Sequence, residues 1–97
     1  MSIPTLTDLK AFLRVEGNHL DVPLSLALGA AVAEAGNFIG GSLAEQWPDE
    51  LPSDVGMALL LLSQVHVDAG EVEDHEYRRA AAQHLLRPYR LTTGLAA

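Results

Sequence analysis

The sequence of 97 residues contains no cysteine, few aromatic side chains and no long apolar run. Without cysteine, disulfides and thiolate metal sites are both excluded. The longest uninterrupted apolar run, Met57–Leu62, is too short to span a membrane. The first residues do not place a continuous apolar core after a basic region, so we expect neither a signal peptide nor a membrane-bound protein.

Basic residues are missing from most of the chain. Residues 16–76 contain twelve Asp and Glu residues and no Lys or Arg, whereas four of the six basic residues lie in the segment 78–91. The net charge of −7 argues against a general nucleic-acid-binding protein, which needs a basic surface to release counterions from phosphates. The uneven distribution predicts a molecule with an acidic part and a basic end.

Length and composition indicate one small globular domain. The chain is 48% hydrophobic and long enough for a single modest core. We expect one domain over residues 1–97, with the packed core at about residues 5–91. Residues 92–97 have little to bury, and we expect them to form a flexible tail.

Hydrophobic periodicity predicts an all-α fold, a small bundle of about four helices with an extended C-terminal tail. The first helix should cover about residues 6–14. Thr5 and Asp8 have the spacing of a capping box at its start, and Gly17–Asn18 should stop it.

The second helix is long and rich in small residues. Asp21 is its expected N-cap, and Gly40–Gly41 should close it. A stripe at helical spacing faces the core, and much of the remaining circumference is glycine or alanine. These small residues allow another backbone to approach closely, either inside the same chain or from a neighbouring subunit.

The loop of residues 41–54 contains two prolines, four acids and the single tryptophan, Trp47. A tryptophan in a polar loop either folds back onto the core or anchors a partner. A third helix, about residues 53–67, follows. Two apolar stripes cover most of its circumference, so we expect it to be the central helix and an assembly surface. The first stripe consists of Val55, Ala58, Leu59, Leu62 and Val65, and the second of Met57, Leu60, Leu61 and Val67.

The fourth helix should begin near Asp74, as its N-cap, and end before Pro88. Tyr77, Ala81 and Leu85, together with Ala82 and Leu86, are expected to face the core. The arginines of this segment should point elsewhere.

The polar residues do not form a recognisable catalytic or metal-binding pattern. His66 with Asp68, or His75 with His84, could be joined into a metal site on paper, but neither pair has a metal-ligand spacing. The Gly40–Gly41 pair ends a helix instead of opening one, which is the wrong geometry for a phosphate site. We therefore expect no catalytic residue, no metal and no cofactor.

The order of short motifs along the chain resembles a known family. The relevant segments are "TLTDLKAFLRVEGNHLDVPLSLALGAAVAEAGNFIGG", then "LPSDVGMALLLLSQVHVDAGE", and finally Leu85–Arg90, "LLRPYR". In this order they are similar to the small head–tail connector proteins of long-tailed bacteriophages, also called head-completion or adaptor proteins. The similarity covers about residues 5–91.

The resemblance implies a non-enzymatic structural protein of the virion, assembled in the host cytoplasm. Such proteins form a ring beneath the portal, usually with about twelve subunits. The ring extends the DNA channel, through which DNA passes without specific binding, and gives tail or stopper proteins a docking surface. The C-terminal segment is expected to reach toward the portal or a neighbouring subunit.

Two sets of residues follow from the charges and the resemblance together. One set is expected to contact protein partners: Arg78, Arg79, Arg87, Tyr89, Arg90, Trp47, Met57, Leu60 and Leu61. The other set is expected to face the channel, where negative charge would let DNA slide: Glu34, Asp49, Glu50 and Asp54.

Other functions remain open at this point. The arginines may simply be solvated on a surface helix. The chain could be a small helical regulatory or protein-interaction module that uses the apolar face of residues 55–67. A weaker alternative is a nucleic-acid-binding domain that uses the C-terminal arginines.

Overall fold

The computed structural model describes residues 2–67 and 72–90. Within these residues the chain forms four helices of eight or more residues, α1 (Leu6–Leu13), α2 (Asp21–Ile39), α4 (Ser53–Val67) and α5 (Val72–Leu86). A short helix α3 (Leu43–Gln46) lies between α2 and α4, and the 3₁₀ helix η1 (Arg87–Tyr89) follows α5. The all-α prediction is confirmed. The expected tail, residues 92–97, lies outside the described residues.

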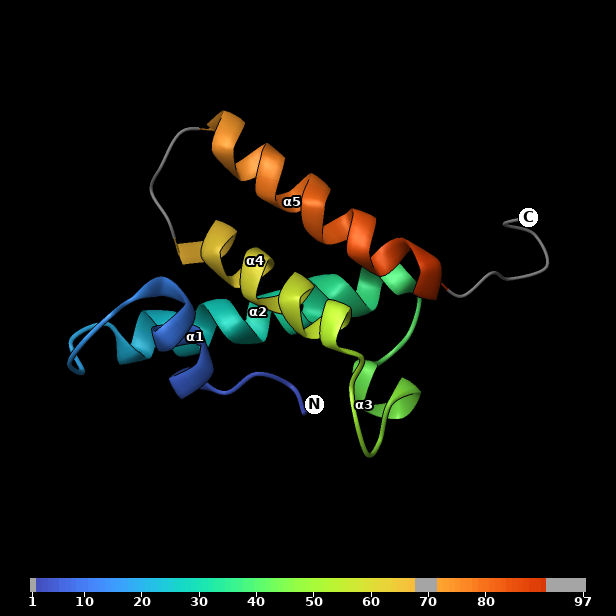
Figure 1. The fold of residues 1–97 in the computed structure, drawn as a ribbon, viewed down its shortest axis with the longest axis horizontal. Coiled ribbons are helices and arrows are strands. Elements are labelled where there is room, and N and C mark those ends of the chain that lie inside the picture. Colours follow the sequence, from blue (N-terminus) through green and yellow to red (C-terminus); the bar gives the residue numbers. More distant parts are fainter. Residues whose placement is uncertain (1, 68–71, 91–97) are drawn as a thin grey trace.

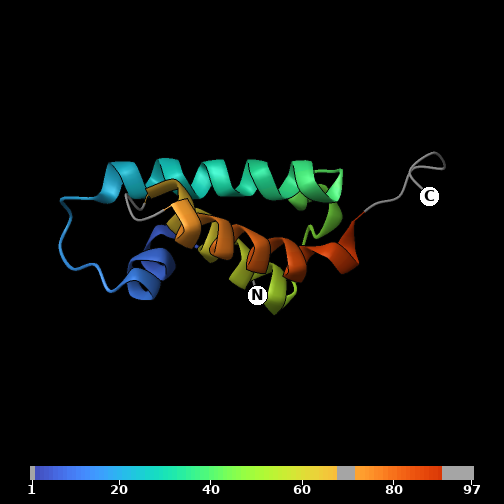
Figure 2. The same cartoon turned by 90° about the horizontal axis from the view of Figure 1, so that it is seen from above.

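The helices form two layers (Figures 1 and 2). Helix α2 makes one layer, and α1, α4 and most of α5 make the other. Helix α4 packs against both α2 and α5, which confirms its expected central position. Helices α2 and α5 run in roughly the same direction along the molecule (Figure 1).

The core lies where α4 meets α2 and α5. The predicted stripe of α4 is buried, and Leu59 and Leu62 are at most 1% exposed. Alanines of α2 pack against this stripe, and their small side chains bring the two helices close together. Ser63 is the one polar residue of α4 in this core, and its hydroxyl donates to the Leu59 carbonyl at 2.7 Å. The core therefore contains no unpaired hydroxyl at this position.

Local signals explain the ends of α1. The capping box is confirmed, because the Thr5 N–H donates to Asp8 at 2.8 Å and the Asp8 N–H donates to the Thr5 hydroxyl at 3.2 Å. The helix ends at Leu13, as the predicted range of about 6–14 requires, but its C-cap is Arg14 and not the expected Gly17–Asn18. Arg14 takes a left-handed conformation with φ of 59° and donates its N–H to the Ala11 carbonyl. A non-glycine residue is strained there, and the helix C-cap hydrogen bonds offset that strain.

Helix α2 ends as predicted and begins differently. Gly40 has φ of 94°, and its N–H donates to the Gly36 carbonyl at 2.9 Å, so it closes the helix. Asp21 is not the N-cap, because Leu20 occupies that position and makes no side-chain cap. Asp21 instead accepts a hydrogen bond from the Lys10 ammonium at 2.7 Å. This ion pair fastens α1 to the first turn of α2.

Helix α5 differs from the prediction in its start and in its buried face. It begins at Val72 and not at Asp74. Ala82 and Leu86 are buried as expected, whereas Tyr77 is 80% exposed and Ala81 is also exposed. Tyr77 lies five positions before Ala82, which places it about 140° away around the helix. With alanines on several sides, the sequence did not define which side of α5 faces α4.

Candidate functional site

The C-terminal motif folds back onto the loop between α2 and α4. The Tyr89 hydroxyl donates to the Asp54 carboxylate, at 2.9 Å from Oδ1 and 3.1 Å from Oδ2. The Tyr89 ring meets the Trp47 ring edge to face, with centroids 5.3 Å apart and an interplanar angle of 83°. We call Trp47, Asp54 and Tyr89 the C-terminal latch. It fixes the position from which the chain leaves η1.

Two effects support the latch. An edge-to-face pair of this spacing places the positive edge of one ring against the negative face of the other. The hydrogen bond to Asp54 favours the protonated phenol and raises the pKa of Tyr89, and partial burial acts in the same direction. Trp47 is half-buried and packs against the core, so the structure agrees with the alternative in which Trp47 folds back.

The two arginines of the motif have different environments. The Arg90 guanidinium carbon lies 4.9 Å from the centre of the Phe38 ring, a cation–π contact with the last turn of α2. Arg87 is exposed at the start of η1, and Arg90 is also exposed although it lies over Phe38. Of this pair, Arg90 is therefore engaged with α2 on its ring-facing side, and both arginines are at the surface.

A polar cluster joins α2, α4 and α5, and we call it the three-helix cluster. The Arg79 guanidinium donates to Glu34 twice, from Nε at 2.7 Å and from Nη2 at 3.2 Å. His66 Nε2 lies 2.8 Å from the same carboxylate. The three side chains are 27–38% exposed. The cluster thus lies at the edge of the core, where water screens it only partly.

The contacts within this cluster set its protonation states. The hydrogen bond from Arg79 lowers the pKa of Glu34 below its ordinary value of 4.5. Desolvation opposes the shift, and the contact with His66 reinforces it. The same contact raises the pKa of Arg79. Glu34 is therefore a carboxylate at neutral pH, and it holds α5 against α2.

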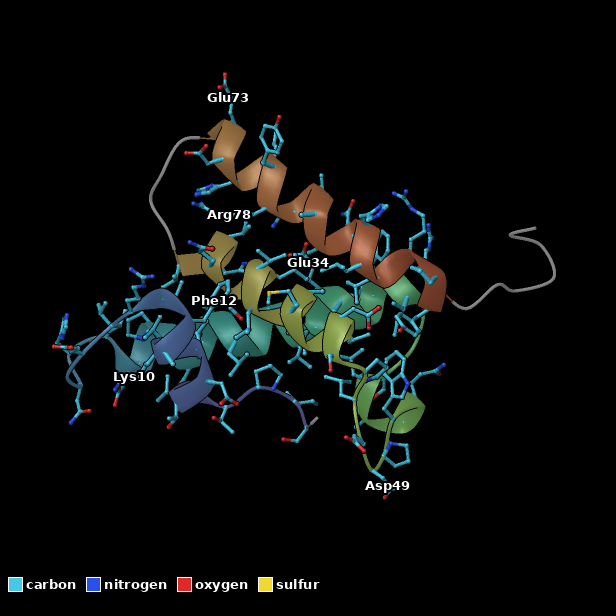
Figure 3. The ribbon with its side chains drawn as sticks, in the orientation of Figure 1. Lys10, Phe12, Glu34, Asp49, Glu73 and Arg78 are labelled. Atoms are coloured by element: carbon cyan, nitrogen blue, oxygen red, sulfur yellow. The ribbon has the colours of Figure 1, made fainter. Side chains whose placement is uncertain are left out.

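The structure separates the predicted basic residues. Arg79 points inward to Glu34, and Arg78 is half-buried on the side of α5 that faces α4 (Figure 3). Arg90 is exposed and lies over the Phe38 ring, and Arg87 is exposed on η1. Four arginines close together in sequence therefore do not form one continuous basic surface.

The predicted acidic residues are separated in the same way. Glu34 belongs to the three-helix cluster and Asp54 to the C-terminal latch. Asp49 projects from the tip of the loop between α3 and α4 (Figure 3), and Glu50 beside it is also exposed. Only the loop places predicted channel acids together on the surface.

The second apolar stripe of α4 is partly covered. Met57 is 43% exposed, whereas Leu60 and Leu61 are half-buried and Leu61 packs against the core. The stripe that contains Leu59 and Leu62 is fully buried. A protein-interaction module acting through residues 55–67 would need an exposed apolar face on α4. Most of that face instead packs within the subunit.

Two features were not anticipated from the sequence. The contact between Phe38 and Arg90 joins residues far apart in the chain, so no local pattern indicates it. A groove of about 610 Å³ runs beside the end of α2 and the start of α3, and Ala33 and Asn37 are among the residues that line it. The glycines of "NFIGGS" could have indicated this groove from the sequence, because residues without large side chains leave space beside the helix end.

Among the described residues, no group of His, Asp and Glu side chains is arranged to hold a metal ion.

Comparison with known proteins assigns the chain to a family. Among curated proteins and among solved structures, none matches this chain. A family model described as "Phage gp6-like head-tail connector protein" matches residues 3–90, which include every described helix. The motif order that suggested a connector is thus supported over nearly the whole length, and the chain belongs to the phage head–tail connector family.

Proposed function

We propose that this connector is a non-enzymatic adaptor that forms a ring of about twelve copies beneath the portal. The ring extends the DNA channel, and its far side receives a tail-completion or stopper protein. It assembles in the host cytoplasm and remains in the virion at the head–tail junction. The observation that carries this proposal is the family match over residues 3–90, which covers the whole described bundle.

The C-terminal latch supports a role for the end of the chain in docking. Because Tyr89 is held by Asp54 and Trp47, η1 has a fixed position against the bundle. Arg87 is exposed on η1. We propose that Arg87 and the following segment contact an acidic surface of the portal or of the adjacent subunit. Charge at such a contact sets register and the rate of encounter more than the total affinity.

Asp49 and Glu50 support the proposed channel surface. They are neighbouring exposed acids on the loop between α3 and α4, whereas the Glu34 and Asp54 carboxylates are only partly exposed. We propose that this loop faces the channel, where its negative charge repels phosphates and keeps DNA from adhering. The double variant Asp49→Lys and Glu50→Lys should then bind duplex DNA in a salt-dependent way that the native protein does not.

Binding to purified portal rings tests the proposed docking directly. The native protein should cosediment with portal rings at about one copy per portal subunit. Arg87→Glu should weaken this binding by at least about tenfold at low salt and less at high salt. Arg14→Glu is the matched control, because Arg14 is exposed at the opposite end of the chain's fold and should leave binding unchanged. Failure of the native protein to bind portal rings would contradict the proposal.

A further inference from the structure

One side of α2 is apolar and uncovered. Val22 is 72% exposed and Leu26 is 71% exposed, and Gly29 and Ala33 continue the same side at helical spacing. A side chain at Gly29 would meet no atom within 4 Å. We call these four residues the outer face of α2. It is a long strip of large and then small apolar residues with open space above it.

The outer face carries no charge. Helix α2 contains only two charged residues, and both point into other elements: Asp21 pairs with Lys10, and Glu34 pairs with Arg79. A helix that is apolar on most of its circumference must be covered on most of it. The fold buries only the inner side of α2, at Leu24, Ala27, Ala31, Ala35 and Ile39. The uncovered apolar side is therefore a candidate contact surface.

A membrane is a poor partner for this helix. By length and composition alone, α2 could cross a membrane. Its inner side, however, packs against the leucines of α4, which a spanning helix would leave bare. Helices that lie on a membrane surface carry Lys or Arg on their polar side, and α2 has neither. Glycine and alanine on an exposed side instead favour close approach of another protein helix.

The same chain presents a matching surface on α5. Tyr77 is 80% exposed, and Ala80, Ala81 and His84 continue the same side of the helix and are also exposed. We call these four residues the outer face of α5. An exposed tyrosine flanked by alanines is a single large projection on a flat helix surface. Such a side chain gains most when it fits over small residues of a partner.

We propose that the outer face of α5 in one copy packs on the outer face of α2 in the next copy, with Tyr77 over Gly29 and Ala33. The two faces belong to different sides of the molecule, so the contact is heterologous and can repeat around a ring. This inference rests on the proposed ring and names the two surfaces that build it.

Charge fixes the direction of the packed helices. The exposed acids Glu73 and Asp74 begin α5, and the N-terminal end of α2 carries the positive end of its helix dipole. At the other end, Arg87 follows α5, whereas α2 has no basic residue in its last turn. Both ends therefore favour parallel packing.

Parallel packing is also the direction that a ring requires. Within one subunit α2 and α5 already run in roughly the same direction (Figure 1). In a ring of about twelve copies, each subunit is rotated by about 30° from the last, so a neighbour's α5 keeps nearly that direction. The groove beside the end of α2 leaves room for the last turn of the neighbour's α5.

Cysteine cross-linking tests this contact, because the native chain has no cysteine. Ala33→Cys and Ala81→Cys would be made separately, mixed and treated with a short bismaleimide. We expect the mixture to give a cross-linked dimer at several times the yield of either variant alone. The double variant should give a ladder that ends in a closed species.

The remaining outcomes overturn the inference in distinguishable ways. If oligomers form but positions 33 and 81 do not cross-link, the ring proposal stands and the contact between subunits lies elsewhere. Preferential self-cross-linking of Ala33→Cys would indicate a two-fold contact. A protein that stays monomeric at every concentration would contradict both the ring and the contact. Flotation of the native protein with vesicles of neutral or anionic lipid, lost in Leu26→Glu, would make the outer face of α2 a membrane surface.

A charged residue on the outer face gives an independent test. Leu26→Glu should raise the dissociation constant for assembly by at least about 100-fold, because the new carboxylate would be buried without a partner. Its unfolding midpoint at concentrations below assembly should match that of the native monomer, since Leu26 is exposed. The control is Ala11→Glu at an exposed position of α1, which should assemble normally. Equal assembly of the two variants would overturn the inference.

Discussion

Glu34 offers the sharpest test of how this small bundle is held together. Its carboxylate accepts two hydrogen bonds from Arg79 and contacts His66, so one residue of α2 holds both α4 and α5. The variant Glu34→Gln keeps the size of the side chain and removes its charge. It also replaces one acceptor oxygen by an NH₂ group, which cannot accept from Arg79 Nε.

The expected cost follows from the exposure of the cluster. Hydrogen bonds to charged groups contribute about 1.5–3 kcal/mol when buried, and exposed ion pairs contribute about 0.2–1 kcal/mol. The side chains here are 27–38% exposed, so the cost lies between these limits. We expect Glu34→Gln to lose about 1.5 kcal/mol of the free energy of unfolding. For a domain of this size, that lowers Tm by about 6–12 °C.

The pH dependence of stability provides a second test of the same ion pair. A carboxyl whose pKa is lowered on folding stabilises the folded state above its ordinary pKa of 4.5, and this contribution is lost as pH falls through the folded value. The native protein should therefore lose stability on acidification, below about pH 4.5, more steeply than Glu34→Gln. The difference between the two proteins should shrink as the pH falls.

Thermal denaturation at pH 7 and at pH 3, followed by far-UV circular dichroism, measures both effects. Glu45→Gln is the matched control, because Glu45 is an exposed helical glutamate with the same chemistry. If the two glutamate variants have the same Tm at pH 7, the three-helix cluster does not stabilise the bundle and the reasoning is refuted.

Three further predictions concern the cap, the core and the latch. Thr5→Ala removes the capping box and should cost about 1 kcal/mol in chemical denaturation; an unchanged midpoint would contradict a stabilising cap. Leu62→Ala opens a cavity in the central helix and should cost about 3 kcal/mol, whereas Met57→Ala, at a position 43% exposed, should cost less than about 1 kcal/mol; equal losses would contradict the assigned face of α4. In an absorbance titration, the Tyr89 phenol should ionise above its ordinary pKa of 10.0, and Tyr89→Phe should remove this late step; a late step that persists in Tyr89→Phe would contradict the latch.

Local signals in the sequence were enough to predict the helices and the central position of α4. The capping box at Thr5 and the glycines at the end of α2 are short-range patterns, and both act as predicted. Helix α4 has a complete apolar stripe, so its buried face was defined by the sequence alone. These features depend on residues no more than a few turns apart.

The contacts between helices could not be predicted in the same way. Glu34 and Arg79 are 45 residues apart, and the sequence offers several acids that could have paired with Arg79. The buried face of α5 was assigned only in part: Ala82, Leu85 and Leu86 lie on the core as expected, whereas Tyr77 and Ala81 were expected inside and are exposed. The order of charges along the chain predicted one basic end. In the fold, the arginines of that segment make separate contacts.

The uncovered side of α2 shows how the sequence and the structure combine. Small residues in α2 predicted close packing but left open whether the partner was in the same chain. The structure divides these residues, because Ala27, Ala31 and Ala35 pack inside while Gly29 and Ala33 remain exposed. If the outer face of α2 meets a second copy, the helix packs within its own chain on one side and against a neighbouring subunit on the other.

The most direct test of the connector account is the native mass of the protein over a concentration series, alone and with purified portal rings. We predict a closed species of about twelve subunits, formed by the protein alone at high concentration or on the portal at low concentration. A protein that remains monomeric both alone and in the presence of the portal would contradict the account.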